Sequence, residues 1–383
     1  MELYSAFEWL LIDLANQYGL DKQDYSVRLA WANENLDYLE QLDDADDPAT
    51  FIAATHAVRD AQAGIPSGYM VELDSSSSGI QLLSVLTRCV TGMENTGVLC
   101  NGHRPDIYTK LTEVMQTEHE RKPVKQALMC YMYGSKSEPE KAFGDQVPLF
   151  LEKAEEVAPR ACIARSVLLN TWQPFADAHT WIMPDGFTVF KEVKQTKDTS
   201  ISVPMLDNRN FTFRHKIIKG KEKAVTNAAD VTHSIDALVV REMARRCNYD
   251  INRLTYIKDL IEFFCELPEI TDRTKFVSLV EVGNIEPENI HEYDPQLLAR
   301  VHELIEVSLE HTSFELVTIH DAFKCLPNYV QYMRETYNRI LWDMYNSDLL
   351  MDIVHQITGT KYDNFPHEED VAIQILQNNY AIN

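Results

Sequence analysis

The pattern of apolar and polar positions along the chain predicts mainly helices. In the first 70 residues, apolar positions recur at helical spacing in three segments, residues 2–18, 25–41 and 49–62. The first segment is interrupted by Glu8 and Asp13, which is typical of a buried helix and not of a signal peptide. No apolar run approaches the length of a membrane span, so no membrane partner is expected.

Two apolar strands are predicted to end on an aspartate. Residues 69–74 deliver Asp74 into a turn of small residues, and residues 314–321 end at Asp321, with a further strand at 323–326. A carboxylate in such a turn suits a divalent cation and the close approach of a phosphate. Asx-turn or N-cap chemistry explains an aspartate there equally well. If the two aspartates lie close together, they form the pair of carboxylate ligands that is usual in a two-metal site.

One helix is predicted over residues 121–134. Strong helix formers occupy its middle, and Gly134 suits the position after the last turn. Arg121 and Lys125 would lie near the positive N-terminus, where phosphates are attracted, and Tyr133 would lie at the far end. A solvated amphipathic helix with a glycine stop would show the same pattern.

Composition and charge narrow the classes of function. The 383 residues are 45% hydrophobic and 25% charged, which is enough for one large or two moderate cores. Seven cysteines without a CxxC pair indicate free thiols in a reducing compartment. The net charge of -24 argues against nucleic-acid binding by the whole surface. Any nucleic acid must therefore be held by local patches, metal ions or another subunit.

One basic patch stands out in this acidic chain. Residues 191–223 contain nine Lys or Arg and four Asp or Glu, so the segment is about +5 and the remainder about -29. The β-prone stretches TSISVPML and FTFRHKII flank the turn-like residues 207–210. This pattern predicts a basic β-hairpin at about 198–223, and a solvated surface hairpin is the alternative interpretation.

Three stretches, in this order along the chain, share a resemblance to one enzyme family. Asp74-Ser-Ser-Ser-Ser-Gly79-Ile-Gln81, Arg121-x3-Lys125-x7-Tyr133-Gly134 and His320-Asp321-Ala-Phe resemble motifs A, B and C of the single-subunit DNA-directed RNA polymerases of phages (the T-seven type) and mitochondria. Weaker matches are Tyr108, 34 residues after Asp74, then Pro184-Asp185-Gly186, His233-Ser-Ile-Asp236 at the expected start of a helix, and residues 375–383. The resemblance covers nearly the whole chain.

The resemblance implies a metal site. Asp74 and Asp321 would bind two Mg²⁺ ions, and the backbone carbonyl of Ser75 would add a ligand. The ions would lower the pKa of the RNA 3′-hydroxyl and stabilise the leaving pyrophosphate.

The resemblance also assigns the nucleotide-binding residues. Lys125 would neutralise the phosphates and protonate the pyrophosphate, while Arg121 and Lys22 would contact the triphosphate. Tyr133 and His233 would select ribose over deoxyribose. The remaining nucleotide-binding positions are Tyr108, Ser78 and Gly134.

The implied architecture is an α+β, mostly helical right-hand polymerase with an antiparallel palm sheet. The palm is expected from residues 1–90 and 234–383, and the fingers from residues 91–233. The 88 positions from His233 to Asp321 exceed those of the compact phage enzymes. The additional residues are predicted to form a helical insertion at about 249–310. This insertion would dock a partner, cover nucleic acid or have no function of its own.

Two departures concern the motifs themselves. Pro123 is tolerated only in the first turn of a helix, which would put Arg121 just outside it. Ser75 stands where the phage enzymes commonly have glycine.

The largest departure is the expected lack of the N-terminal promoter-binding domain, since only about 70 residues precede motif A. This pattern resembles the larger, catalytic subunit of the heterodimeric RNA polymerase II of phage N-four and relatives. The resemblance implies phage transcription in the cytoplasm of an infected bacterial host. The implied partners are a DNA template, NTPs, the RNA product, a smaller polymerase subunit and an accessory factor for promoter opening.

Two other functions fit parts of the pattern. A family A DNA polymerase usually has a glutamate in motif A that blocks the ribose hydroxyl, whereas residues 76–78 are serines that leave room. Its motif C typically reads His-Asp-Glu, and this chain has Ala322 in the third place. A catalytically inactive polymerase-like scaffold is the second alternative, and the presence of Asp74, Asp321 and Lys125 argues against it.

Overall fold

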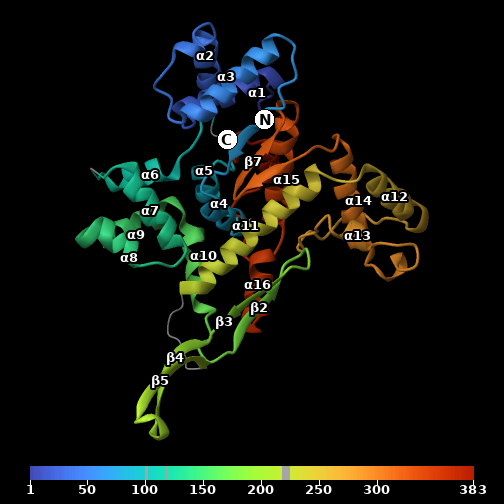
Figure 1. Ribbon diagram of the computed structural model, residues 1–383. Coiled ribbons are helices and arrows are strands. Elements are labelled where there is room, and N and C mark those ends of the chain that lie inside the picture. The colour runs from blue at the N-terminus through green and yellow to red at the C-terminus, as the bar shows by residue number, and fades with distance from the viewer. Residues whose placement is uncertain (100–101, 118, 218–224) are drawn as a thin grey trace.

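The computed structural model describes residues 1–99, 102–117, 119–217 and 225–383. Helices make up 56% of the chain and the sheets are small and antiparallel, which confirms a mostly helical α+β fold. A long hairpin projects from one end of the molecule, α1–α3 form the opposite end, and both termini lie near β7 (Figure 1).

The first three predicted helices are present; the first two are shorter than predicted, and the third begins one residue earlier. They are α1 (Ala6–Ala15), α2 (Tyr25–Asn35) and α3 (Pro48–Gln62), and they share a core of their own. A capping box starts α1, because Ser5 and Glu8 each accept a hydrogen bond from the other's backbone N–H. The helix then changes to a π-turn that contains Gly19 at φ 117°.

A three-stranded sheet lies at the centre of the molecule. Its order is β1 (Val71–Asp74), β7 (Ala322–Cys325) and β6 (Val317–Ile319), and both pairings are antiparallel. The strand predicted from Phe314 is shorter because the Phe314 backbone N–H donates to the carbonyl of Cys247 instead. The helices α4 (Ser78–Leu86), α11 (Val225–Cys247) and α15 (Val330–Asn346) contact one another beside this sheet.

A group of helices follows the motif A turn (Figure 1). They are α5 (Val90–Asn95), α6 (Ile107–Met115), α7 (Arg121–Met132), α8 (Ser137–Phe143), α9 (Val147–Val157) and α10 (Pro159–Asn170). Pro123 lies in the first turn of α7 as expected, but Arg121 is inside the helix and not ahead of it. At the other end, Gly134 has φ 100° and donates to the carbonyl of Tyr131 at 2.8 Å, which is the predicted glycine stop.

The predicted basic hairpin is also present. Strands β4 (Gln195–Val203) and β5 (Arg209–Ile217) pair antiparallel beyond a smaller hairpin of β2 (Ala178–Ile182) and β3 (Thr188–Glu192). The first strand starts earlier than predicted, at Gln195. It also ends earlier, because Pro204 follows it and begins a 3-10 turn. The last part of the predicted range, residues 218–223, lies outside the described residues.

Helix α11 corrects two expectations. His233 lies well inside this continuous helix and does not open it. The segment before it contains neither Gly nor Pro, and Ala228, Val231 and Ile235 are buried at helical spacing. The expected boundary between residues 233 and 234 therefore falls within one helix.

The predicted extra helices between His233 and Asp321 are present. They are α12 (Ile251–Phe264), α13 (Glu281–Asn284) and α14 (Pro295–Leu309), and they pack around a separate apolar core. They lie beside α15 on the flank opposite α6–α9 (Figure 1).

The C-terminal segment returns to the central sheet after α16 (Leu349–Thr358) and α17 (Ala372–Leu376). Tyr380 stacks on Tyr25 with ring centroids 4.9 Å apart. The backbone N–H of Asn383 donates to the carbonyl of Asp74 at 2.9 Å, so the tail runs alongside the end of β1. Among the described residues, no helix combines the length and apolar character needed to cross a bilayer.

Candidate active site

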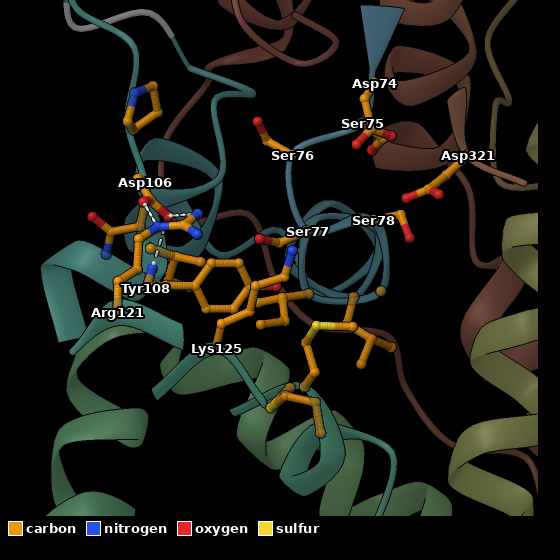
Figure 2. A pocket seen from close by; sticks show the side chains of 18 of the residues that line it. Asp74, Ser75, Ser76, Ser77, Ser78, Asp106, Tyr108, Arg121, Lys125 and Asp321 are labelled. Atoms are coloured by element: carbon orange, nitrogen blue, oxygen red, sulfur yellow. Dashed lines mark hydrogen bonds and ion pairs between the residues drawn. The ribbon is translucent and has the colours of Figure 1, made fainter. Parts of the chain in front are cut away.

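Asp74 and Asp321 lie side by side at one end of the central sheet. Asp74 is the last residue of β1 and pairs with Ala322, and Asp321 directly precedes Ala322 in the turn between β6 and β7. The backbone N–H of Ser75 donates to the carbonyl oxygen of Asp321 at 3.3 Å. Both carboxylates appear on the same side of the cavity in Figure 2. The two strands thus bring together the aspartates that the sequence places far apart.

Left-handed residues shape both turns that hold these aspartates. Ser77 has φ 58° just before α4, and His320 has φ 57° just before Asp321. Residues other than glycine rarely adopt this conformation, which costs about 1–3 kcal/mol and is concentrated at functional sites.

A buried polar network fixes the motif A turn. The hydroxyl of Ser75 lies 3.2 Å from Oε1 of Gln81 and 3.0 Å from the hydroxyl of Tyr337. The side-chain amide of Gln81 donates in turn to the carbonyls of Thr96 and Ala381, at 2.9 and 3.0 Å. The Ser75 hydroxyl is therefore committed to holding the turn, which leaves its backbone carbonyl as the group available to a ligand.

The carboxyl groups around Asp74 and Asp321 lie close to one another and are not paired with basic side chains in the described part of the chain. Burial, and then repulsion from Asp321, raises the pKa of Asp74 to about 6. Burial and the same aspartate raise the pKa of Asp236, on α11, to about 6. In the described part of the chain, neither Asp74 nor Asp321 forms an ion pair with a Lys or Arg. This set of oxygen ligands fits a hard divalent cation such as Mg²⁺, which would relieve the repulsion.

Four cationic side chains line the same cavity, which encloses about 970 Å³ of empty space, its open mouth included. They are Lys22, Arg104, Arg121 and Lys125. Figure 2 shows Arg121 and Lys125, both from α7, across the cavity from the two aspartates. Negative charge on one side and positive charge on the other suit a metal-bound phosphate ligand.

Asp106 and Tyr108 hold the cations of α7 in place. Asp106 caps α6 and forms a two-pronged ion pair with Arg121, in which Nη2 lies 3.1 Å from Oδ1 (Figure 2). The guanidinium of Arg121 and the ammonium of Lys125 lie 5.2 and 5.7 Å from the ring centre of Tyr108. Burial is the main cause that raises the pKa of Tyr108 to about 12, so its hydroxyl stays protonated.

Tyr133 closes the other end of the cavity against Gly79. A Cβ atom on Gly79 would lie 2.7 Å from the Tyr133 hydroxyl, so only glycine leaves room for that hydroxyl. The ring of His233 lies 4.8 Å from the ring of Tyr133. Burial, followed by the charge of Asp236, raises the pKa of Tyr133 to about 12.

Most residues singled out from the sequence meet in this cavity. Those that line it are Lys22, Asp74, Ser75, Ser78, Tyr108, Arg121, Lys125, Tyr133 and Asp321. His233 is outside the lining and reaches the site through Tyr133, and Gly134 serves to end α7.

Three groups near the site have no role in the interpretation of the sequence. Asp236 lies one helical turn after His233, so its spacing could have placed it on the same face. Asp106, two residues before Tyr108, could have been recognised as a helix N-cap. Arg104 has no local signal, because its place in the cavity depends on contacts with the C-terminal segment.

Comparison with known proteins points to one kind of enzyme. A protein family described as DNA-dependent RNA polymerase matches residues 4–142, a range that includes Asp74 and α7 but not Asp321. The chain is 23% identical over 260 residues to a DNA-directed RNA polymerase of Pseudomonas phage phiKMV, covering 50% of this chain and 32% of that protein. It is 24% identical over 124 residues to the mitochondrial DNA-directed RNA polymerase of Schizosaccharomyces pombe, covering 28% and 11%. The chain thus spans a third or less of either relative.

Proposed function

We propose that this chain is the catalytic subunit of a DNA-directed RNA polymerase, a nucleotidyltransferase that extends the RNA 3′ end from NTPs. The observation that carries the proposal is the adjacency of Asp74 and Asp321, across one cavity from Lys125 and Arg121. Nucleotidyl transfer needs stabilisation of charge on the attacking oxygen, the phosphate and the leaving group, and this arrangement offers groups for each.

Asp74 and Asp321 would hold two Mg²⁺ ions, with the backbone carbonyl of Ser75 as a further ligand. Bound Mg²⁺ would activate the 3′-hydroxyl and neutralise charge on the phosphates. The strained turns at Ser77 and His320 would keep the two carboxylates in place before any ligand binds.

The cationic residues would bind the triphosphate. Lys125 projects from α7 and would donate a proton to the pyrophosphate as it leaves. Arg121 would be oriented by its ion pair with Asp106, and Lys22 would approach the phosphates from the loop after α1.

The end of the cavity at Tyr133 would recognise ribose. Its protonated hydroxyl can donate a hydrogen bond, and a deoxyribose would leave this buried group unpaired. His233 would support the orientation of the Tyr133 ring, while Tyr108 and Ser78 would line the base and template side.

The nucleic-acid partners would be a DNA template and the RNA product. The β4–β5 hairpin supports this part of the proposal, because it is basic and projects away from the acidic remainder. Resemblance to the N-four type further suggests a smaller subunit and an accessory factor for promoter opening, with action in the cytoplasm of an infected bacterial host.

Extension of an RNA-primed DNA template tests the proposal. The assay would use Mg²⁺ and either ribo- or deoxyribonucleotides, with this chain alone and with its candidate smaller subunit, beside Asp321→Ala. Extension with ribonucleotides only, lost in Asp321→Ala, is the expected result. Extension with deoxyribonucleotides would favour the DNA polymerase alternative, and no extension in any combination would favour the inactive scaffold.

A further inference from the structure

Arg104 differs from the other cations of the cavity in its surroundings. It comes from the loop ahead of α6 and lines the cavity together with Lys22 and Arg121. Its Nε atom donates to the side-chain oxygen of Asn383, and its backbone N–H donates to Asp24 at 2.5 Å. In the part of the chain that the structure describes, its two Nη atoms form no hydrogen bond or ion pair.

The neighbouring arginines have acceptors for their guanidinium groups. Arg121 forms the two-pronged ion pair with Asp106, and the buried Arg28 donates to the carbonyls of Gln23 and Asp21. Burial lowers the pKa of the Arg104 guanidinium, and the acidic groups Asp106 and Asp21 act on it only through space. Arg104 is half-buried and has no ion-pair partner among the residues that the structure describes, an arrangement that a bound anion would stabilise.

We propose that Arg104 binds the triphosphate of the incoming nucleotide, as a fourth phosphate contact beside Lys22, Arg121 and Lys125. The inference rests on the proposed function, because it adds a residue to that same site. Arg104, Lys22, Arg121 and Lys125 all line this one cavity, so a triphosphate bound in it would be surrounded by all four cations.

The geometry of the Arg104 side chain suits a phosphate. The bond from Nε to Asn383 fixes the guanidinium plane, and the free Nη atoms can then donate paired hydrogen bonds to phosphate oxygens. A lysine in this place would supply the charge without the paired donors.

Titration calorimetry of the full chain with inorganic tripolyphosphate and Mg²⁺ tests the assignment. We expect Arg104→Gln to weaken binding about tenfold, as for a lost charge-assisted hydrogen bond, and Arg104→Lys to weaken it less. Lys110→Gln is the matched control, because it removes one positive charge from the exposed side of α6, outside the cavity. Primer extension by Arg104→Gln should show a higher KM for NTP with a smaller change in kcat.

Unchanged tripolyphosphate binding in Arg104→Gln, or equal weakening in Lys110→Gln, would overturn the assignment. If Arg104→Gln weakened the binding of primed template but left tripolyphosphate affinity unchanged, Arg104 would contact the nucleic-acid backbone instead. That result would also overturn the assignment. Should Arg104→Gln fail to fold, the comparison of Arg104→Lys with wild type decides, since equal affinities would contradict a role for paired donors. Tripolyphosphate binding needs no catalysis, so a wild-type chain that binds it but extends no primer would contradict only the proposed function.

Discussion

The backbone N–H of Ser75 donates to the carbonyl oxygen of Asp321 across 3.3 Å, which joins the two turns that hold the aspartates. The carboxylates of Asp74 and Asp321 are therefore brought together by strand pairing and a backbone hydrogen bond, and no cationic side chain among the described residues bridges them. A site held in this way is already formed before nucleotide or metal binds.

Lys125 should matter far more than its neighbour on the same helix. Lys125→Gln removes a cation that lines the cavity, and we expect the rate of single-nucleotide addition to fall about 10²–10³-fold. Lys122→Gln is the matched control, because Lys122 is exposed on α7 and is outside the cavity lining. Equal rates for the two variants in rapid-quench experiments would exclude Lys125 from the chemistry.

Gly79→Ala should reduce the preference for ribonucleotides. The added methyl would lie 2.7 Å from the Tyr133 hydroxyl, so the ring must shift and its hydrogen bond to the ribose would weaken. We expect the ratio of kcat/KM for NTP to that for dNTP to fall at least about tenfold. Gly283→Ala, in α13 with open space around it, should leave the ratio unchanged. A normal ratio in Gly79→Ala would separate Tyr133 from sugar selection.

Asp74→Asn should stabilise the protein at neutral pH in the absence of metal. The folded-state pKa of Asp74, about 6, lies above the ordinary value of 3.8 for an aspartate, so its ionised form opposes folding. The contribution of Asp74 to stability is full below pH 4 and is lost as the pH rises through 6. We expect Asp74→Asn to exceed wild type by no more than about 1 kcal/mol in free energy of unfolding at pH 7, because solvent reaches this side chain and screens its charge, and by little at pH 4.

Denaturant unfolding in EDTA at several pH values would measure this difference. Asp145→Asn, at an exposed position outside the cavity lining, is the matched control. A constant difference between Asp74→Asn and wild type from pH 4 to 7 would contradict the raised pKa.

A buried ion network should be the most sensitive electrostatic feature of the fold. Glu242 is fully buried and accepts hydrogen bonds from Arg245 at 2.9 Å, Arg246 at 3.0 Å and Ser278 at 2.5 Å. Glu242→Ala would remove the shared acceptor of this network and leave the buried Arg246 with Asp343 as its remaining carboxylate partner, so we expect a loss of about 3–5 kcal/mol in unfolding free energy.

An exposed ion pair provides the contrast for that measurement. Asp198 and Arg214 pair at 2.9 Å on the β4–β5 hairpin, where both side chains face solvent. Asp198→Ala should cause no measurable change in stability, because solvent and salt screen such pairs. A similar loss in both variants would mean that burial does not determine the strength of these interactions.

Local features of the sequence were sufficient to predict the elements that form the site. Asp74 at a strand end, the glycine stop of α7 at Gly134 and the β4–β5 hairpin all depend on neighbouring residues, and each is present. Helix α11 starts earlier than the motif at His233 predicts, because the residues before this motif also follow helical spacing.

Long-range contacts were not predictable in the same way. The adjacency of Asp74 and Asp321 depends on which strands pair, and the position of Arg104 depends on the returning C-terminal residue Asn383. Asp106 was missed because its partner, Arg121, belongs to another helix. Periodicity and capping preferences contain no information about such pairs of distant segments.

Iron-mediated cleavage would test most directly whether Asp74 and Asp321 form one metal site. Fe²⁺ bound in place of Mg²⁺ would reduce added H₂O₂ to hydroxide and a hydroxyl radical, itself becoming Fe³⁺, and the radical would cut the nearby backbone. We expect cleavage near residue 74 and near residue 321. Excess Mg²⁺ should suppress it, and Asp321→Asn should abolish it at both places. Cleavage at only one of them, or instead at the exposed group of Glu262, His302 and Glu306, would contradict a shared site.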